Sequence, residues 1–288
     1  CPLWDVRGQA LYWIDGRRQL VQRYVPATGV VSEWEAPGHI GSIALCESGR
    51  VQLALDTDFH LLDVGTGTLE RVGDAVTHPA ERMRLNDGRT DRAGRFVLGS
   101  MTMGRHEPLG ALYQFTPEGR VNVLDRGIQL ANATCFSPDG RWLYFADSMT
   151  RQVRRYPYDP ATGAAGTGEL FIDTSVYGSS PDGATVDAEG HLWVALVLVG
   201  KLARFRPDGT LERTIDFAAD TFITCPCFGG PDLDTIYLTS ISNSGNLLRS
   251  ENPDAGAVFV IKGSGVRGIE EARFDDSRLG ATTPHPLS

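Results

Sequence analysis

Three short polar stretches interrupt strand-like apolar sequence, at positions where a buried pleated strand would not place them. They are RLNDG at residues 84–88, LANAT at 130–134 and SSPDG at 179–183. Side-chain oxygens of Asn and Asp are hard ligands that suit Ca²⁺, Mg²⁺ or Mn²⁺, and also Zn²⁺ where a coordination position stays open. The residues of interest are therefore Asn86, Asn132 and Asp182.

The same tripeptides also have a simpler explanation. Asn-Asp-Gly and Pro-Asp-Gly are common turn sequences, and we interpret two other copies, at residues 138–140 and 207–209, as turns only. By residue type alone, a turn explains each polar stretch at least as well as a ligand does. The elements that position the stretches must decide between the two.

Those elements follow an internal repeat of two or three aromatic or aliphatic residues followed by Asp, Ser, Gly or Ala. Its six copies begin at residues 11, 53, 96, 143, 192 and 236. A period of about 40–50 residues with strand-like content is typical of propeller blades. Gly-containing turns and alternating segments around the copies indicate about four antiparallel strands per unit. We therefore predict an all-β, six-bladed β-propeller, as a single domain over residues 1–288.

Closure of the ring would bring the polar stretches together. The innermost strands of a propeller surround its central axis, and equivalent positions of different blades lie at equivalent radii. Each polar stretch lies a similar distance before the apolar motif of its blade. We therefore expect Asn86, Asn132 and Asp182 to face one another near the axis.

Composition excludes several classes of partner. The formal net charge is −9 and no run of Lys and Arg occurs, which argues against nucleic acid and anionic membranes. The chain shows no signal-peptide pattern and no apolar run of membrane-spanning length, so we expect a cytoplasmic protein, as a monomer or small homo-oligomer. Five cysteines without zinc spacing indicate free, mostly buried thiols in a reducing compartment.

The chain resembles the SMP-30/gluconolactonase family, also called the regucalcin family, over nearly its whole length. The motifs that carry the resemblance are CPLWD and LYWID near the start, RLNDG with GSM, FSPDG with YFADS, PDG with DAEG, then CFGG and GSGVRG. The resemblance implies a six-bladed propeller with one divalent metal ion on the axis (Ca, Zn, Mn or Mg). It also implies hydrolysis of a sugar lactone to the open-chain acid.

The family's site residues transfer position by position. Its metal-binding Asn and Asp correspond to Asn132 and Asp182, and its substrate-contacting Arg and Asn correspond to Arg84 and Asn86, with Asp87 beside them. The family's metal-binding Glu would immediately precede Cys1. We expect that Glu, and the N-terminal strand that closes the ring in the family, to lie upstream of the given chain.

A second difference from the family concerns the residues that would contact the far end of the sugar. A substrate-binding Glu of the animal members aligns near Gly104, where Arg105, His106 or Glu107 could replace it. The alternative is a solvated loop. Two arginines, Arg84 and Arg105, would favour a substrate with an anionic tail.

In the mechanism that we expect, Asp182 is both metal ligand and general base toward water. No G-x-S-x-G motif supports a serine nucleophile. The lactone stays open among glucono-, arabino- and galactonolactone and acidic or sulfonated relatives. Two other functions also remain open: a metal-dependent phosphotriesterase or arylesterase, and a non-catalytic propeller that binds a protein.

Overall fold

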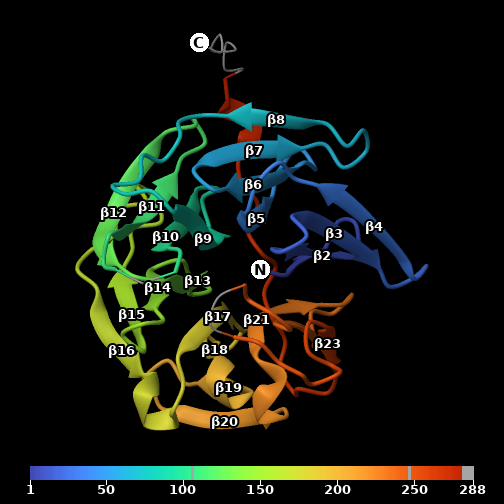
Figure 1. The fold of residues 1–288 in the computed structure, drawn as a ribbon, viewed down its shortest axis with the longest axis vertical. Helices are drawn as coiled ribbons and strands as arrows, with labels where there is room; N and C mark the ends of the chain where they lie inside the picture. Colours follow the sequence, from blue (N-terminus) through green and yellow to red (C-terminus); the bar gives the residue numbers. More distant parts are fainter. Residues whose placement is uncertain (105–106, 246–247, 281–288) are drawn as a thin grey trace.

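The structure, a computed structural model, describes residues 1–104, 107–245 and 248–280 as a ring of six antiparallel sheets (Figure 1). Five sheets have four strands, and within the described residues the sixth has three. The predicted six-bladed propeller is thereby confirmed. From the axis outward, blade 1 consists of β1 (Leu3–Asp5), β2 (Ala10–Asp15), β3 (Leu20–Val25) and β4 (Val30–Glu35), and blade 2 of β5 (Ile40–Leu45), β6 (Val51–Leu55), β7 (Asp58–Leu62) and β8 (Leu69–Val72). In the same order, blade 3 consists of β9 (Met83–Thr90), β10 (Phe96–Thr102), β11 (Gly110–Phe115) and β12 (Val121–Ile128), and blade 4 of β13 (Ala131–Phe136), β14 (Trp142–Asp147), β15 (Gln152–Pro157) and β16 (Glu169–Asp173). Blade 5 consists of β17 (Pro181–Val186), β18 (Leu192–Leu196), β19 (Lys201–Phe205) and β20 (Leu211–Asp216), and blade 6 of β21 (Ile223–Gly229), β22 (Thr235–Ser240) and β23 (Val258–Ile261).

Helical structure is confined to single 3-10 turns. These are η1 (Thr174–Tyr177), η2 (Val197–Val199), η3 (Ala219–Thr221) and η4 (Asp276–Arg278). None of the helices in the described part of the chain has the length and apolar character needed to cross a bilayer.

The apolar repeat forms the second strand of every blade. Its six copies fall in β2, β6, β10, β14, β18 and β22, and β10 and β18 are buried along their whole length. A strand that packs against neighbouring blades on both of its faces needs apolar side chains at every position, so its sequence is a continuous apolar run. The turns that precede the second strand are held by Asp side chains: Asp187 Oδ1 accepts the backbone N–H of Glu189 and of His191.

Six apolar clusters of the described residues fill the six interfaces between neighbouring blades. The cluster between blades 2 and 3 contains Phe59 and Phe115, whose rings stack at 3.9 Å between centroids. The smallest cluster joins blade 6 to blade 1, where Trp4 stacks on Tyr237 at 5.5 Å. The hydrophobic core is therefore a ring of inter-blade clusters.

Residues 263–279, which we call the C-terminal strap, run from blade 6 to blade 2 (Figure 1). The strap forms a β-bridge from Gly268 to Asp187 and a parallel one from Phe274 to Cys46. Asp187 and Cys46 directly follow the innermost strands of their blades, β17 and β5. The strap therefore lies at the C-terminal ends of the innermost strands. The polar stretches lie toward the N-terminal ends of these strands, at the opposite end of the axis.

The closing strand expected upstream of Cys1 stays a prediction. Blade 6 has three strands within the described residues, and the resemblance to the family places the additional strand in this blade.

Candidate active site

The polar stretches lie on the innermost strands of three successive blades, on β9, β13 and β17. Asn86 Nδ2 donates to Asn132 Oδ1 at 3.2 Å and to Ala131 O at 2.7 Å, so blades 3 and 4 meet directly through these side chains. Neither 86–88 nor 181–183 forms a turn, whereas 138–140 and 207–209 do, as expected. Tripeptides that are equivalent by residue type alone thus have different structures: two lie on innermost strands and two form turns.

Register shifts occur in these innermost strands at the level of the polar residues. In β13 the pairing with β14 shifts between Asn132 and Cys135, and Ala133 there has a left-handed φ of 55°. In β17 the pairing with β18 shifts between Pro181 and Ala184, across Asp182. A bulge bends a strand and changes the direction of the side chains within it. This is how polar side chains reach the axis from strands that are otherwise apolar.

Ser148 connects blade 4 to blade 5 beside Asp182. Asn132 Nδ2 donates to Ser148 Oγ at 2.8 Å, and Ser148 Oγ donates to Pro181 O at 2.6 Å. Because the Asn132 amide nitrogen is used in this way, its oxygen, which accepts from Asn86 with one lone pair, offers the other lone pair to a ligand at the axis. The sequence analysis did not identify Ser148 as a site residue. Its place directly after β14 was the feature that could have indicated it.

Asp182 carries a partly buried carboxyl group with negative neighbours. Burial, together with Cys225 and Asp87, raises the pKa of Asp182 well above its ordinary value. No Lys or Arg within the described ranges forms an ion pair with it. A carboxylate in such a place lacks a compensating cation, and a bound cation would favour its charged form.

The residues present fit a divalent metal ion. Asp182 offers an uncompensated carboxylate, and Asn132 offers an amide oxygen whose orientation Ser148 fixes. These are hard oxygen donors of the kind that Ca²⁺, Mg²⁺ and Mn²⁺ prefer. The expected Glu before Cys1 would add a second carboxylate, and that ligand stays a prediction.

Arg84 and Asn86 form a joined pair. Arg84 donates from one guanidinium nitrogen to Asn86 Oδ1 at 2.7 Å and to Leu85 O at 2.9 Å. Burial lowers the pKa of Arg84, and Asp56 partly opposes this change. The Asn86 amide therefore has protein partners on both atoms, while Arg84 keeps further N–H donors.

Asp87, which the family resemblance places beside the substrate, is buried. Its exposed fraction is 7%, and its Oδ2 accepts the Thr134 backbone N–H at 2.7 Å. Burial raises the pKa of Asp87, and Arg89 opposes the rise. Asp87 Oδ1 lies 3.6 Å from Cys1 Sγ, on the axial side.

The other two candidates for substrate binding, Arg105 and His106, lie outside the described residues. Around them, Met103 N donates to Arg82 O at 2.7 Å and Glu107 N donates to Thr102 Oγ1 at 3.0 Å. Their proposed contacts to the sugar stay predictions.

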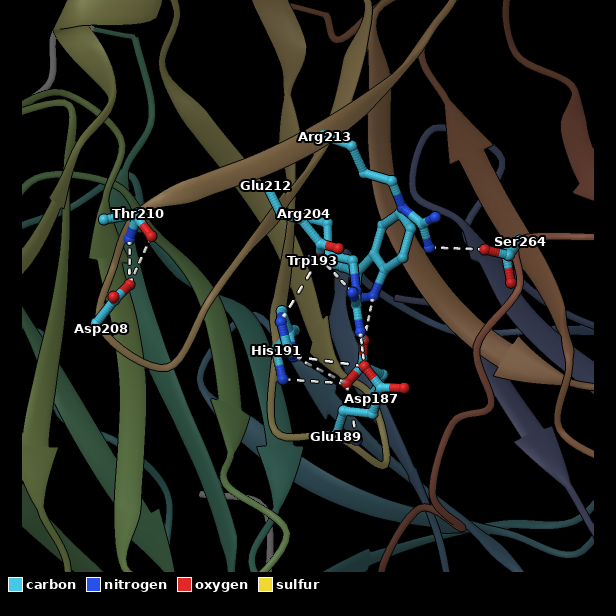
Figure 2. Close-up of polar contacts among 10 residues, drawn as sticks. All are labelled: Asp187, Glu189, His191, Trp193, Arg204, Asp208, Thr210, Glu212, Arg213 and Ser264. Atoms are coloured by element: carbon cyan, nitrogen blue, oxygen red, sulfur yellow. Dashed lines mark hydrogen bonds and ion pairs between the residues drawn. The ribbon is translucent and has the colours of Figure 1, made fainter.

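A larger cluster of charged residues lies in blade 5 and serves the fold (Figure 2). Arg204 has a side-chain exposure of 3% and pairs with Asp187 at 2.8 Å, with Glu189 at 2.7 Å and with Glu212. His191 lies 3.6 Å from Glu212. The guanidinium occupies the centre among the carboxylates, so this cluster is an ion-pair network around a buried arginine.

Comparison with known proteins agrees with this arrangement. The model of the SMP-30/Gluconolactonase/LRE-like region matches residues 1–242. A 6-deoxy-6-sulfogluconolactonase of Pseudomonas putida is 34% identical over 95% of this chain and 94% of that protein. The pentonolactonase XacC of Haloferax volcanii is 30% identical over 97% and 94%. The crystal structure of a calcium-binding regucalcin from Agrobacterium tumefaciens has a TM-score of 0.85 at 28% identity, over 95% and 92%. The chain belongs to the SMP-30/gluconolactonase family.

Proposed function

We propose that this protein hydrolyses a sugar lactone at the axial site around Asn132 and Asp182. The observation that carries the proposal is the connected set of Asn86, Asn132 and Ser148, which ends beside the partly buried carboxyl group of Asp182. Membership of the family and two relatives named as lactonases support it.

The reaction needs a base for water and a donor for the developing oxyanion. Asp182 accepts a proton from the water that attacks the lactone carbonyl carbon, and returns it to the ring oxygen as the ring C–O bond breaks. Arg84 directs its remaining N–H donors at the substrate and holds it in one orientation. A divalent cation, when bound at Asn132 and Asp182, polarises the carbonyl group and lowers the pKa of water.

For the substrate we propose an aldonolactone with an anionic group at its far end. Arg84 forms no ion pair with a carboxylate of the described residues, which leaves a half-buried cation for a substrate anion. The relative from Pseudomonas putida, by its name, acts on a sulfonated lactone. Equal kcat/KM values for glucono-1,5-lactone and its 6-sulfo analogue would contradict this proposal.

We predict that Asp182→Asn lowers kcat/KM for the lactone by about 10²–10⁴-fold, because the base is lost while the shape is kept. Asp139→Asn is the matched control: Asp139 lies in the Pro-Asp-Gly turn at 138–140, where Ser137 Oγ donates to its carboxylate at 2.6 Å. That variant should keep wild-type activity. Lactone hydrolysis that survives Asp182→Asn would refute the mechanism.

The same assay with aryl esters and phosphotriesters tests the competing hydrolase function.

A further inference from the structure

Two thiols and a carboxylate meet on the axis next to the proposed catalytic residues. The ligand atoms of Cys1, Asp87 and Cys225 all lie within 4.8 Å of one another, and Cys1 Sγ is 3.6 Å from Asp87 Oδ1. They come from three blades: Cys1 precedes β1, Asp87 lies on β9 and Cys225 on β21.

Two of the three are held in place by the fold. Asp87 is fixed through its other oxygen by the Thr134 N–H at 2.7 Å. Cys225 packs against Gly183, where a Cβ would lie 2.4 Å from its sulfur, so a side chain at 183 would displace the thiol. The register of β21 also shifts between Ile223 and Pro226, as in the strands that carry the proposed metal ligands.

The distances suit a tetrahedral thiophilic ion. With Zn–S bonds of about 2.3 Å and Zn–O bonds of about 2.1 Å, neighbouring ligands lie roughly 3.6–3.8 Å apart. The Cys1–Asp87 pair already has this separation, and a contraction of about 1 Å is the most that the remaining pairs need. Burial raises the pKa of the Cys225 thiol, so binding would displace its proton.

We propose that Cys1, Asp87 and Cys225 form a binding site for a thiophilic divalent cation of the zinc class, with a coordination position left open. The site uses a different set of ligands from the hard oxygen donors Asn132 and Asp182, beside which it lies, and it does not rest on the proposed lactonase activity. Soft thiolate ligands select ions that a set of amide and carboxylate oxygens binds less well.

The test uses the whole chain, reduced and stripped of metal, titrated with Cd²⁺ alone. We expect thiolate-to-cadmium charge-transfer absorption in the ultraviolet that saturates with one Cd²⁺ per chain. Cys225→Ser should weaken this binding at least about tenfold. Cys1→Ser should do the same, and because Cys1 is only partly buried its loss leaves the core intact.

Two controls make the result specific. Cys46→Ser alters a buried thiol of blade 2 that is not part of the cluster, and should leave the absorption unchanged. Asp182→Asn should also retain it, although lactone hydrolysis is lost. Absorption that persists in both Cys1→Ser and Cys225→Ser, or that disappears in Asp182→Asn, overturns the proposal without bearing on the lactonase mechanism.

Discussion

Ser148 shows how one hydroxyl group can set the orientation of a candidate metal ligand. It accepts from the Asn132 amide nitrogen and donates to Pro181 O, the carbonyl directly before Asp182. Together with Asn86, which donates to the Asn132 oxygen, Ser148 fixes which amide atom of Asn132 points in which direction. Ser148 is therefore a positioning residue for both Asn132 and Asp182.

We predict that Ser148→Ala lowers metal affinity and kcat/KM by about 10–100-fold, as removal of a ligand's supporting partner does elsewhere. Ser148→Thr should restore most of the loss, since it returns the hydroxyl group. Ser42→Ala is the matched control, because Ser42 is equally buried but its Oγ has no hydrogen-bond partner among the described residues. Metal affinity measured by calorimetry separates this role from a merely structural one, which would leave affinity unchanged.

At the scale of elements, blade 5 depends on a buried cation as well as on apolar packing. Arg204 on β19 contacts the turn before β18 through Asp187 and Glu189, and its guanidinium lies 5.8 Å from the Trp193 ring (Figure 2). The guanidinium of Arg213 on β20 lies 5.6 Å from the centroid of the same ring and donates to Ser264 O of the strap at 2.6 Å. The blade thus combines an ion-pair network with an attachment point for the strap.

We predict that Arg204→Met destabilises the protein by about 3–5 kcal/mol, because three carboxylates lose their buried counter-charge. Arg213→Met, which removes the second cation near Trp193, should cost about 1 kcal/mol. Urea denaturation of both variants checks the difference. Equal losses would show that the arginines act through the indole ring alone.

The same network predicts a dependence on pH. Arg204 holds the pKa of Glu189 below its ordinary value through a hydrogen bond and its charge. A lowered pKa stabilises the fold above the ordinary value of about 4.3 and loses that contribution as the pH falls through the lower folded-state value. The stability difference between wild type and Arg204→Met should therefore shrink from pH 7 toward pH 3. A difference that grows on acidification would contradict the assignment.

For the whole molecule, the strap adds a second closure to the ring of apolar clusters. Phe274 is fully buried between blades 2 and 3, where its ring lies 5.6 Å from Phe115. Arg89 on β9 pairs with Glu271 of the strap at 3.2 Å and donates to Ala184 O at 2.9 Å. Blades 2, 3 and 5 are thereby joined at the end of the axis opposite to the proposed site.

We predict that Phe274→Ala costs about 3–5 kcal/mol of stability, through lost burial and the cavity it leaves. Leu170→Ala, on the outer strand of blade 4 with an exposed fraction of 57%, should change stability by less than about 0.5 kcal/mol. Hydrogen exchange should show faster opening in blades 2 and 3 of the Phe274 variant. Uniformly unchanged exchange there would mean that the strap is not part of the closure.

The sequence by itself determined the number of blades and the strands that carry Asn86, Asn132 and Asp182. It could do so because a strand buried on both faces must be apolar throughout, and that pattern repeats once per blade. Residue type alone could not separate Pro181-Asp182-Gly183 from Pro138-Asp139-Gly140, since the two tripeptides have the same local preferences. Only the closed ring decides that one lies on a bulged axial strand and the other in an exposed turn.

Tertiary structure alone also brought Ser148 to Asn132 and the thiols of Cys1 and Cys225 to Asp87. Ser148 and Asn132 both belong to blade 4, whereas Cys1, Asp87 and Cys225 come from three blades, with the two thiols 224 positions apart. No local propensity encodes such a pair, because its distance is set by how six sheets pack around one axis. The family resemblance supplied the oxygen donors, whereas the structure supplied what holds them in place.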